Sequence, residues 1–241
     1  MKKLAFLFLL LSAPGFCGGF GDFEKYADAA SLKPFARDLG ALLGSAIYHT
    51  GRGLGFAGFD VGLREAFQFN PSSGDGIMRR AGVKNISLGW IQGEIGMPFR
   101  LDGFVRGTNY DGLTVAGGGI RWSVMKVNDT PHSFQFMLAL AGHAAVHEQF
   151  SAAHLALSAV GSWRLCPYAI PYLGVGMDRT RLSVKSAPAG SGLIGDHVTA
   201  TGPRLTLGFN LKPAQFVYIG VAANEFFNGR QGLETSLGVR F

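Results

Sequence analysis

The chain has 241 residues, with 22 Lys and Arg against 16 Asp and Glu, a formal charge of +6, and glycine at 36 positions. That glycine content is about twice the usual share of roughly 7% and argues against a helical protein, because glycine suits closely packed, strongly tilted strands. The charge does not support nucleic-acid binding, since the arginines are spread singly along the chain.

The N-terminus has the pattern of a cleaved secretory signal peptide, predicted over residues 1–18. Lys2 and Lys3 precede an apolar run that is too short to cross a bilayer as a helix, and small residues follow. Lipidation of Cys17 is the less favoured alternative, because lipoproteins usually carry a small residue before that cysteine and Phe16 precedes it here. Without Cys17, Cys166 is the single cysteine, so neither an internal disulfide nor a cysteine metal site is expected.

Residues 19–40 are predicted to form a short N-terminal helical segment. Phe23, Tyr26 and Ala27 have helical spacing, and Asp22 is a plausible N-cap. Pro34 interrupts the pattern, so one or two helical turns are expected rather than a long helix. We expect this segment in the lumen of a barrel or at its periplasmic rim, and the sequence leaves the membrane surface open as an alternative.

From residue 41 to 241 the apolar period changes to two, which is typical of strands. Phe59, Val61 and Leu63 alternate with polar or small residues, and the same alternation recurs down the chain. The candidate strands are 41–49, 56–69, 85–96, 100–108, 113–125, 133–145, 154–165, 169–182, 198–211, 215–226 and 231–241. Single-chain bacterial barrels close with an even number of strands, so either 41–49 is not a wall strand or one strand is missing from this count. The expected fold is all-β, an antiparallel transmembrane β-barrel of about 10 strands, with 12 as the alternative.

The links between the candidate strands come in two lengths. Tight links are expected near Pro98, Pro167 and Pro213, and longer ones at 70–83, 147–153 and 183–197. Short turns at one end and long loops at the other are typical of outer-membrane barrels, whose last strand ends in the periplasm. The link at 127–132 fits this pattern poorly, because it should be periplasmic and is of middling length.

The final strand carries alternating apolar and polar faces and ends on an aromatic residue. It resembles the C-terminal sorting signal of bacterial outer-membrane β-barrels. The resemblance implies export to the outer membrane of a diderm bacterium, contact with membrane lipid and lipopolysaccharide, recognition by the barrel-assembly machinery, and a monomer. The residues of this predicted assembly signal are Leu233, Thr235, Leu237, Val239 and Phe241.

A narrower resemblance rests on three segments: 32–40, 58–62, and 92–99 with Arg106 after it. These are similar to an uncharacterised family of bacterial outer-membrane proteins of unknown function. The resemblance implies a barrel and an exported location, and it implies no activity.

Charged residues on the face opposite the apolar set are predicted to point into the lumen, because charges cannot face hydrocarbon cheaply. They are Arg64, Arg121, Arg164, Arg204, Arg240, Asp60, Asp178 and Glu234. Two interpretations follow: a salt-bridge network that fills a narrow barrel, which is favoured, or an arginine-lined constriction that prefers anions.

Aromatic residues near the strand ends suit interfacial girdles, with core packing as the rival interpretation. The candidates are Trp90, Trp122, Trp163, Tyr168, Tyr172, Phe226 and Phe227.

Other motifs carry little chemistry. Residues 53–58 match the glycine spacing of dinucleotide sites but are followed by strand alternation, which favours a glycine-rich turn. The histidines around 143–154, and Asp196 with His197, are expected to be loop residues, and a hydrolytic pair would need a serine beside one of them. No catalytic, cofactor-binding or metal-ligating residue is therefore predicted.

These observations predict a barrel that is not an enzyme and that forms a narrow pore or plugged channel for small solutes. A structural or adhesive surface barrel is the alternative, and a barrel enzyme acting on lipid or peptide is less favoured.

Overall fold

The computed structural model describes residues 19–226 and 229–241, so the predicted signal peptide lies outside the described residues. The helices are α2 (Phe23–Tyr26), α3 (Ala29–Gly44), α4 (Gly76–Arg80) and the 3-10 turn η1 (Pro98–Arg100). The strands are β1 (Phe59–Phe69), β2 (Asn85–Gly96), β3 (Leu101–Tyr110), β4 (Leu113–Ser123), β5 (Phe134–Val146), β6 (Phe150–Trp163), β7 (Ala169–Val184), β8 (His197–Leu211), β9 (Val217–Phe226) and β10 (Arg230–Arg240).

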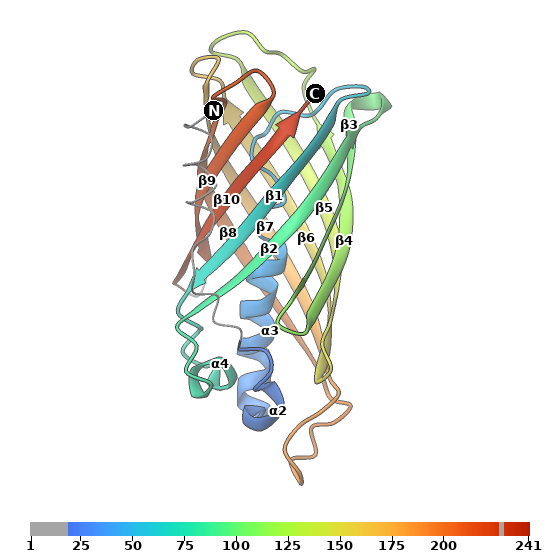
Figure 1. Cartoon of the computed structure of the whole chain (residues 1–241), viewed down its shortest axis with the longest axis vertical. Coiled ribbons are helices and arrows are strands. Elements are labelled where there is room, and N and C mark those ends of the chain that lie inside the picture. The colour runs from blue at the N-terminus through green and yellow to red at the C-terminus, as the bar shows by residue number, and fades with distance from the viewer. Residues whose placement is uncertain (1–18, 227–228) are drawn as a thin grey trace, which may run out of the picture.

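The ten strands form one closed antiparallel barrel, in which each strand pairs with its neighbours in the chain and β1 pairs with β10. The seam between β1 and β10 runs from the pair Asp60 and Arg240 to the pair Gln68 and Gly232. Figure 1 shows the strands steeply tilted around the barrel axis. The predicted ten-stranded antiparallel β-barrel is confirmed.

Period-two alternation separates the two faces of the wall. Along β8, Leu205, Leu207 and Phe209 are exposed on the outside, whereas Arg204 and Thr206 are buried inside. Ile91 and Val105, which are 65% and 70% exposed, extend the apolar outer face to β2 and β3. An apolar outside around a polar inside is the pattern that a barrel needs in order to stand in hydrocarbon.

The wall begins later than residue 41. The segment 41–49 is not a strand: α3 continues to Gly44, and an extended linker, residues 45–58, leads to β1 at Phe59. Leu42, Leu43 and Ile47 are fully buried, so their apolar side chains face protein and not lipid. The helical part of the N-terminal segment therefore extends past the predicted boundary at residue 40.

The prediction that Pro34 ends the helix is wrong, because α3 runs through Pro34 for 16 residues. Proline removes one main-chain donor, which leaves the carbonyl of Ala30 without its helical partner. Ala30 is exposed, so water can satisfy that carbonyl. Burial of the following turns inside the barrel then outweighs the local preference of proline.

The two ends of the barrel differ. We call the end that holds Phe59 and Phe241 the C-terminal mouth; its links are 97–100, 124–133, 164–168 and 212–216. We call the other end the loop end; its links are 70–84, 111–112, 147–149, 185–196 and 227–229. The predicted asymmetry is therefore only partial: the expected long loop at 147–153 is a tight turn, and 124–133 at the mouth is longer than that turn. Asp111 and Gly112 form another tight turn, where both residues have positive φ, as a two-residue hairpin of type I′ requires.

The predicted aromatic girdle is divided. Trp122, Trp163 and Tyr168 are exposed near the C-terminal mouth, where an interfacial girdle would lie. Trp90, Tyr172 and Phe226 are instead buried in the interior, as the rival interpretation held. Phe227 lies outside the described residues.

Replacing Leu205 by Arg tests the depth of the apolar belt, because Leu205 is an outward residue near the middle of β8. The charge is expected to cost about 2–4 kcal/mol of folding free energy in phospholipid vesicles. Leu211→Arg, the same change at the last residue of β8, should cost only about 0–1 kcal/mol. Urea titrations monitored by tryptophan fluorescence give both values, and equal costs would contradict a membrane-embedded belt.

Candidate functional site: the plugged lumen

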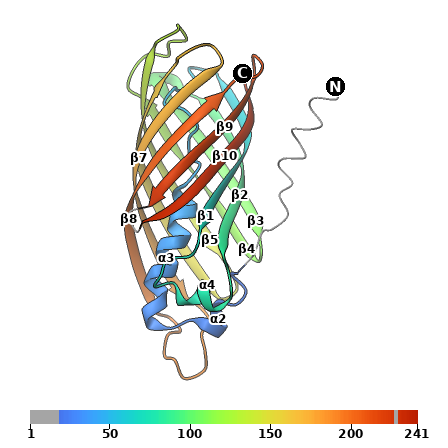
Figure 2. The ribbon, with the colours of Figure 1, turned by 90° about the vertical axis from the view of Figure 1, so that its left-hand side faces the viewer.

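The N-terminal segment fills the interior of the barrel. We call residues 19–58, which comprise α2, α3 and the linker 45–58, the plug. α3 enters from the loop end and packs on the inner face of β6, β7 and β8, while α2 and α4 lie together below it (Figures 1 and 2). Asp28 caps α3 by accepting a hydrogen bond from the Ser31 amide at 2.8 Å. Within the described ranges, no helix is both long and apolar enough to cross a membrane.

Two glycines one helical turn apart allow α3 to approach β7 closely. A β-carbon on Gly40 would collide with the hydroxyl of Thr180, and one on Gly44 would collide with the carboxylate of Asp178. Both strand residues point inward and are buried. A larger residue at either position would therefore clash with the strand side chain that it faces, unless that side chain is changed as well.

Arg106 of β3 satisfies the end of α3. Its guanidinium donates to the carbonyl of Ser45 at 2.9 Å and to the carbonyl of Leu43, which are groups that a helix leaves without partners at its C-terminus. Arg106 also donates to His143 Nε2 at 2.7 Å and stacks over Trp90, with 4.1 Å to the ring centroid. A cation at this position also complements the negative end of the helix dipole.

Wall side chains also hold the main chain of the linker. The amide of Gln92 donates to the Ile47 carbonyl at 3.2 Å, and that of Asn210 donates to the His49 carbonyl at 3.2 Å. Asp102 accepts from the Leu54 amide at 3.0 Å. The linker thus crosses the lumen as a hydrogen-bonded extended chain.

The structure places seven of the eight predicted lumen residues on the inner side of the wall, whereas Arg164 lies in the link after β6. Those buried in the interior are Asp60, Arg64, Arg121, Asp178, Arg204 and Glu234. Arg164 and Arg240 lie at the C-terminal mouth, where they line a cavity.

The interior charges are paired. Arg64 and Glu94 are 2.8 Å apart, and Arg121 contacts the other oxygen of Glu94. Arg204 lies 3.1 Å from Asp178 and 3.5 Å from Glu234. This is the geometry of an ion-pair network and not of an open arginine-lined constriction, and loss of one partner would leave an uncompensated buried charge.

Sequence reasoning missed Glu94, Asp102 and Arg106 as interior residues. Each of them has the inward parity of its strand, since Gln92 and Glu94 alternate with outward Ile91 and Ile95. Applying the alternation of inward and outward residues to β2 and β3 as well would have predicted that these three side chains face the lumen. The contacts of Asp102 and Arg106 with the plug were not predictable, because the sequence left open whether the N-terminal segment lies in the lumen or at the rim.

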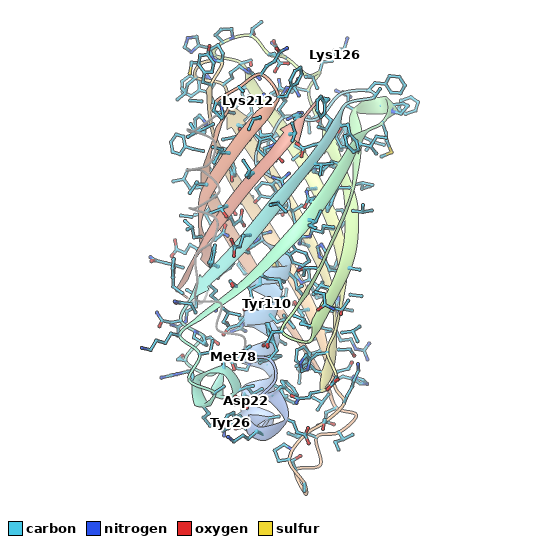
Figure 3. The ribbon with its side chains drawn as sticks, viewed as in Figure 1. Asp22, Tyr26, Met78, Tyr110, Lys126 and Lys212 are labelled. Carbon is cyan, nitrogen blue, oxygen red and sulfur yellow. The ribbon has the colours of Figure 1, made fainter. Side chains whose placement is uncertain are left out.

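An apolar cluster closes the loop end around α2. Phe20, Phe23, Phe35 and Phe150 pack in edge-to-face and tilted arrangements with ring centroids 4.9–6.4 Å apart, and all four are buried. Met78 of α4 belongs to the same core, and Figure 3 shows it at the same end of the molecule as Tyr26. The side chains of this apolar cluster offer no hydrogen bonds to water, so the cluster blocks a water path at the loop end.

Of the three histidines expected in one loop, two are wall residues and the third lies in the turn. His143 and His154 are buried on β5 and β6 with ring centroids 5.6 Å apart, and His147 stacks on Phe150 in the turn. In the described part of the chain, no group of three or more His, Cys, Asp or Glu side chains could hold a metal ion. Residues 53–58, with their dinucleotide-like glycine spacing, belong to the non-helical linker.

One histidine does contact a serine. His197 Nδ1 and Ser183 Oγ lie 2.8 Å apart across the start of β8 and the end of β7, and His197 is exposed. Among the described residues, neither a hydrogen bond nor an ion pair joins Asp196 to this histidine. The pair therefore lacks the orienting carboxylate of a hydrolytic triad.

No protein-family model matches this sequence, and no curated protein matches it. Among solved structures, the chain is similar to the N-terminal β-barrel domain of Pseudomonas aeruginosa OprF, with 12% identity over 78% of this chain and 99% of that one and a TM-score of 0.38. It is also similar to Neisserial surface protein A, with 18% identity over 76% and 95% of the two chains and a TM-score of 0.31.

The chain also matches a loop-deletion mutant of OmpT, an outer membrane protein of Vibrio cholerae. The identity is 10%, the match covers 63% of this chain and 59% of that one, and the TM-score is 0.29. These similarities assign no activity to this chain.

Arg106→Gln tests whether the wall holds the plug. The change removes charge-assisted hydrogen bonds to buried carbonyls, so docking of α3 should weaken by about 2 kcal/mol. Hydrogen exchange of residues 36–44 should then accelerate roughly thirtyfold. Arg179→Gln, at an exposed position on β7, is the matched control and should leave exchange unchanged. Equal protection in both variants would show that Arg106 does not anchor the plug.

A buried carboxyl pair joins α3 to the loop 70–84. Asp38 accepts from the Ser72 amide at 2.6 Å, and Asp75 caps α4 by accepting from the Met78 amide at 3.0 Å. Burial, opposed by the Met78 hydrogen bond and reinforced by the neighbouring Asp38 carboxyl, raises the pKa of Asp75 to about 8. The folded loop therefore binds a proton that the open loop, with a pKa near its usual 3.8, releases.

This pair makes closure of the loop pH-dependent. The stabilisation by the bound proton is complete below about pH 4 and is lost as pH rises through about 8. Between pH 6 and pH 9 the opening free energy of residues 72–83 should fall by roughly 3 kcal/mol, measured by hydrogen exchange corrected for intrinsic rates. Asp75→Asn should flatten this profile, whereas Asp196→Asn in the other long loop should not. An unchanged slope in Asp75→Asn would refute the assignment.

Proposed function

We propose that this protein is an outer-membrane barrel in which residues 19–58 plug a narrow channel for small solutes. The observation that carries the proposal is that polar side chains of the wall hydrogen-bond to the main chain of the plug, as Arg106, Gln92 and Asn210 do. Such contacts can exchange for water when the plug leaves, because the wall groups are themselves polar. A permanent core would more commonly be built from apolar packing.

The size of the lumen supports a channel. Side chains alone fill the interior of an eight-stranded barrel. Here ten strands enclose a helix, whose diameter with side chains is about 10–12 Å. Departure of the plug would leave a water-accessible path of that order, lined by the ion-paired inner face.

The connection to β1 sets the direction in which the plug can leave. The linker joins β1 at Phe59, which lies at the C-terminal mouth. A plug that moved out through the loop end would still trail its linker through the lumen. Only movement toward the C-terminal mouth clears the lumen of chain.

We further propose the cellular setting. The apolar outer face favours the outer membrane of a diderm bacterium, reached by way of a cleaved signal peptide, with membrane lipid and lipopolysaccharide as neighbours. The assembly machinery would recognise the C-terminal strand, and the chain would act as a monomer. Within this strand Val239 and Phe241 are exposed outward at 40% and 67%, which suits a surface that another protein can bind.

A sealed structural or adhesive barrel is the second candidate. The specific observation that favours it is the apolar cluster at the loop end, where Phe23 and Phe35 are fully buried. Opening would expose these rings to water, which costs free energy in proportion to their apolar area. We include no catalysis in the proposal, and Ser183→Ala would be the variant to assay if lipid or peptide hydrolysis were detected.

A reversible lock between plug and wall tests the channel. The β-carbon position of Gly40 lies 3.2 Å from Cβ of Thr180, slightly below the usual separation across a disulfide. The variant Gly40→Cys with Thr180→Cys, in a Cys166→Ser background, should be silent in planar bilayers when oxidised. Reduction should restore the openings of the unlocked barrel, and Arg106→Gln should open at least tenfold more often, because its plug is less firmly docked.

Cys166→Ser alone is the matched control, since its conductance should not respond to reductant. Silence of every variant, including Arg106→Gln, at all voltages would eliminate the channel and leave the structural barrel. Equal conductance in the oxidised and reduced lock would show that the plug does not gate a path.

A further inference from the structure

The C-terminal mouth holds a cavity of about 430 Å³ that the plug does not fill. Its charged lining comes from separate parts of the chain: Arg52 of the linker, Asp129 of the link 124–133, Arg164 after β6, Lys212 after β8, and Arg240 at the end of β10. Figure 3 labels Lys212 at this end of the barrel, opposite the end where Asp22 and Tyr26 lie.

The charges in this cavity do not balance. Asp129 is the single acidic side chain of its lining, and it binds Arg52 at 2.8 Å and 2.5 Å while also contacting Arg164. Arg240 donates to the main-chain carbonyl of Gly53 at 2.5 Å, which brings no negative charge. Four cationic side chains against one carboxylate leave a net charge of three positive units in the lining.

The excess of positive charge in the lining affects Lys212. Its ammonium has no hydrogen-bond or ion-pair partner among the described residues. Partial burial, followed by repulsion from Arg240, Arg52 and Arg164, lowers the pKa of Lys212 to about 8, and Asp129 only partly opposes this. The ammonium of Lys212 and the guanidinium groups of Arg52, Arg164 and Arg240 line the same cavity.

The space is accessible and partly aromatic. Tyr168 and Phe241 line the cavity and are 66% and 67% exposed, so the cavity opens at the mouth. Phe216 and Phe241 stack with ring centroids 5.3 Å apart on the same rim. A ligand in this cavity would meet cations at the bottom and apolar ring faces at the edge.

We propose that this cavity binds a doubly charged oxyanion of the phosphate or sulfate type, free or as part of a small organic ester. The guanidinium groups of Arg164 and Arg240, each engaged through one terminal nitrogen, keep further donors for an oxyanion, and Lys212 adds a point charge. Arg52, whose donors bind Asp129 and the Gly53 carbonyl, contributes positive charge. The inference goes beyond the proposed function, since binding here needs no movement of the plug.

Titration calorimetry with inorganic sulfate tests the site, because the charge of sulfate is constant near neutral pH. The folded full-length protein in nonionic detergent at low salt should bind one sulfate per chain, and Lys212→Gln should weaken binding about tenfold. Lys126→Gln is the matched control, because Lys126 is exposed at the same end and does not line the cavity (Figure 3). Absence of saturable binding in the unaltered protein, or an equal loss in both variants, would overturn the proposal.

A pH series gives an independent measurement. As pH rises from 7 to 9.5, Lys212 should lose its proton and the affinity for sulfate should fall several-fold, since its pKa is lowered to about 8. Lys212→Arg should retain its affinity throughout, because arginine remains charged. A flat profile in the unaltered protein would remove Lys212 from the site.

The source of the oxyanion is distinguished in nanodiscs. If phosphatidylglycerol, but not phosphatidylcholine, competes with sulfate, then the occupant is a lipid headgroup that reaches the mouth from the membrane. If neither lipid competes and glycerol 3-phosphate does, then the occupant is a soluble ester. Both results support the site.

Discussion

A chain that runs inside a closed ring of strands must find partners there for its main-chain amides and carbonyls, because a polar group buried without a partner is costly. Residues 45–58 have neither helix nor sheet to supply those partners. The wall supplies them instead, through Gln92, Asn210 and Asp102 along the linker and Arg106 at the end of α3. The polar side chains on the inner face of the barrel are thus placed to hydrogen-bond to the main chain of this plug. The hydrogen-bonding groups of the plug and of the wall are therefore complementary. The ion pairs between wall residues hold the polar side chains of the inner face in place.

The two ends of the barrel hold the plug by different physical means. At the loop end, Phe23, Phe35 and Phe150 exclude water, so the attachment there depends on apolar area and responds little to salt. At the C-terminal mouth, Arg52 of the plug shares Asp129 with Arg164 of the wall, and that attachment is electrostatic and partly exposed. Salt should therefore loosen the mouth before it loosens the loop end. Because the linker joins β1 at Phe59, at this mouth, a movement of the plug that starts here would start with the linker.

Much of the wall was predictable from alternation alone. Period-two spacing fixed the strands, and the inward parity of Arg64, Arg204 and Glu234 follows from it because side chains alternate between two environments. The plug was not predictable in the same way: Leu42, Leu43 and Ile47 resemble a lipid-facing strand, and only tertiary packing shows that they are covered by protein. The effect of Pro34 was mispredicted for a related reason, because burial of α3 stabilises the helix more than the low helix propensity of proline destabilises it. The tight turn at 147–149 could not be told from the start of a longer loop, because its polar residues suit both.

The chain topology has a consequence for biogenesis. The seam between β1 and β10 turns the sheet into a ring, and the peptide that precedes β1 runs back through that ring to the far rim. A ring that has already shut can admit this peptide only by threading, and the bulky side chains of Phe20 and Phe23 would have to pass through it. Laying the helix against β6, β7 and β8 while the sheet is still an open trough avoids that threading. Zipping of the first strand to the last would then be the final event in maturation, and it would trap the segment already lying in the trough.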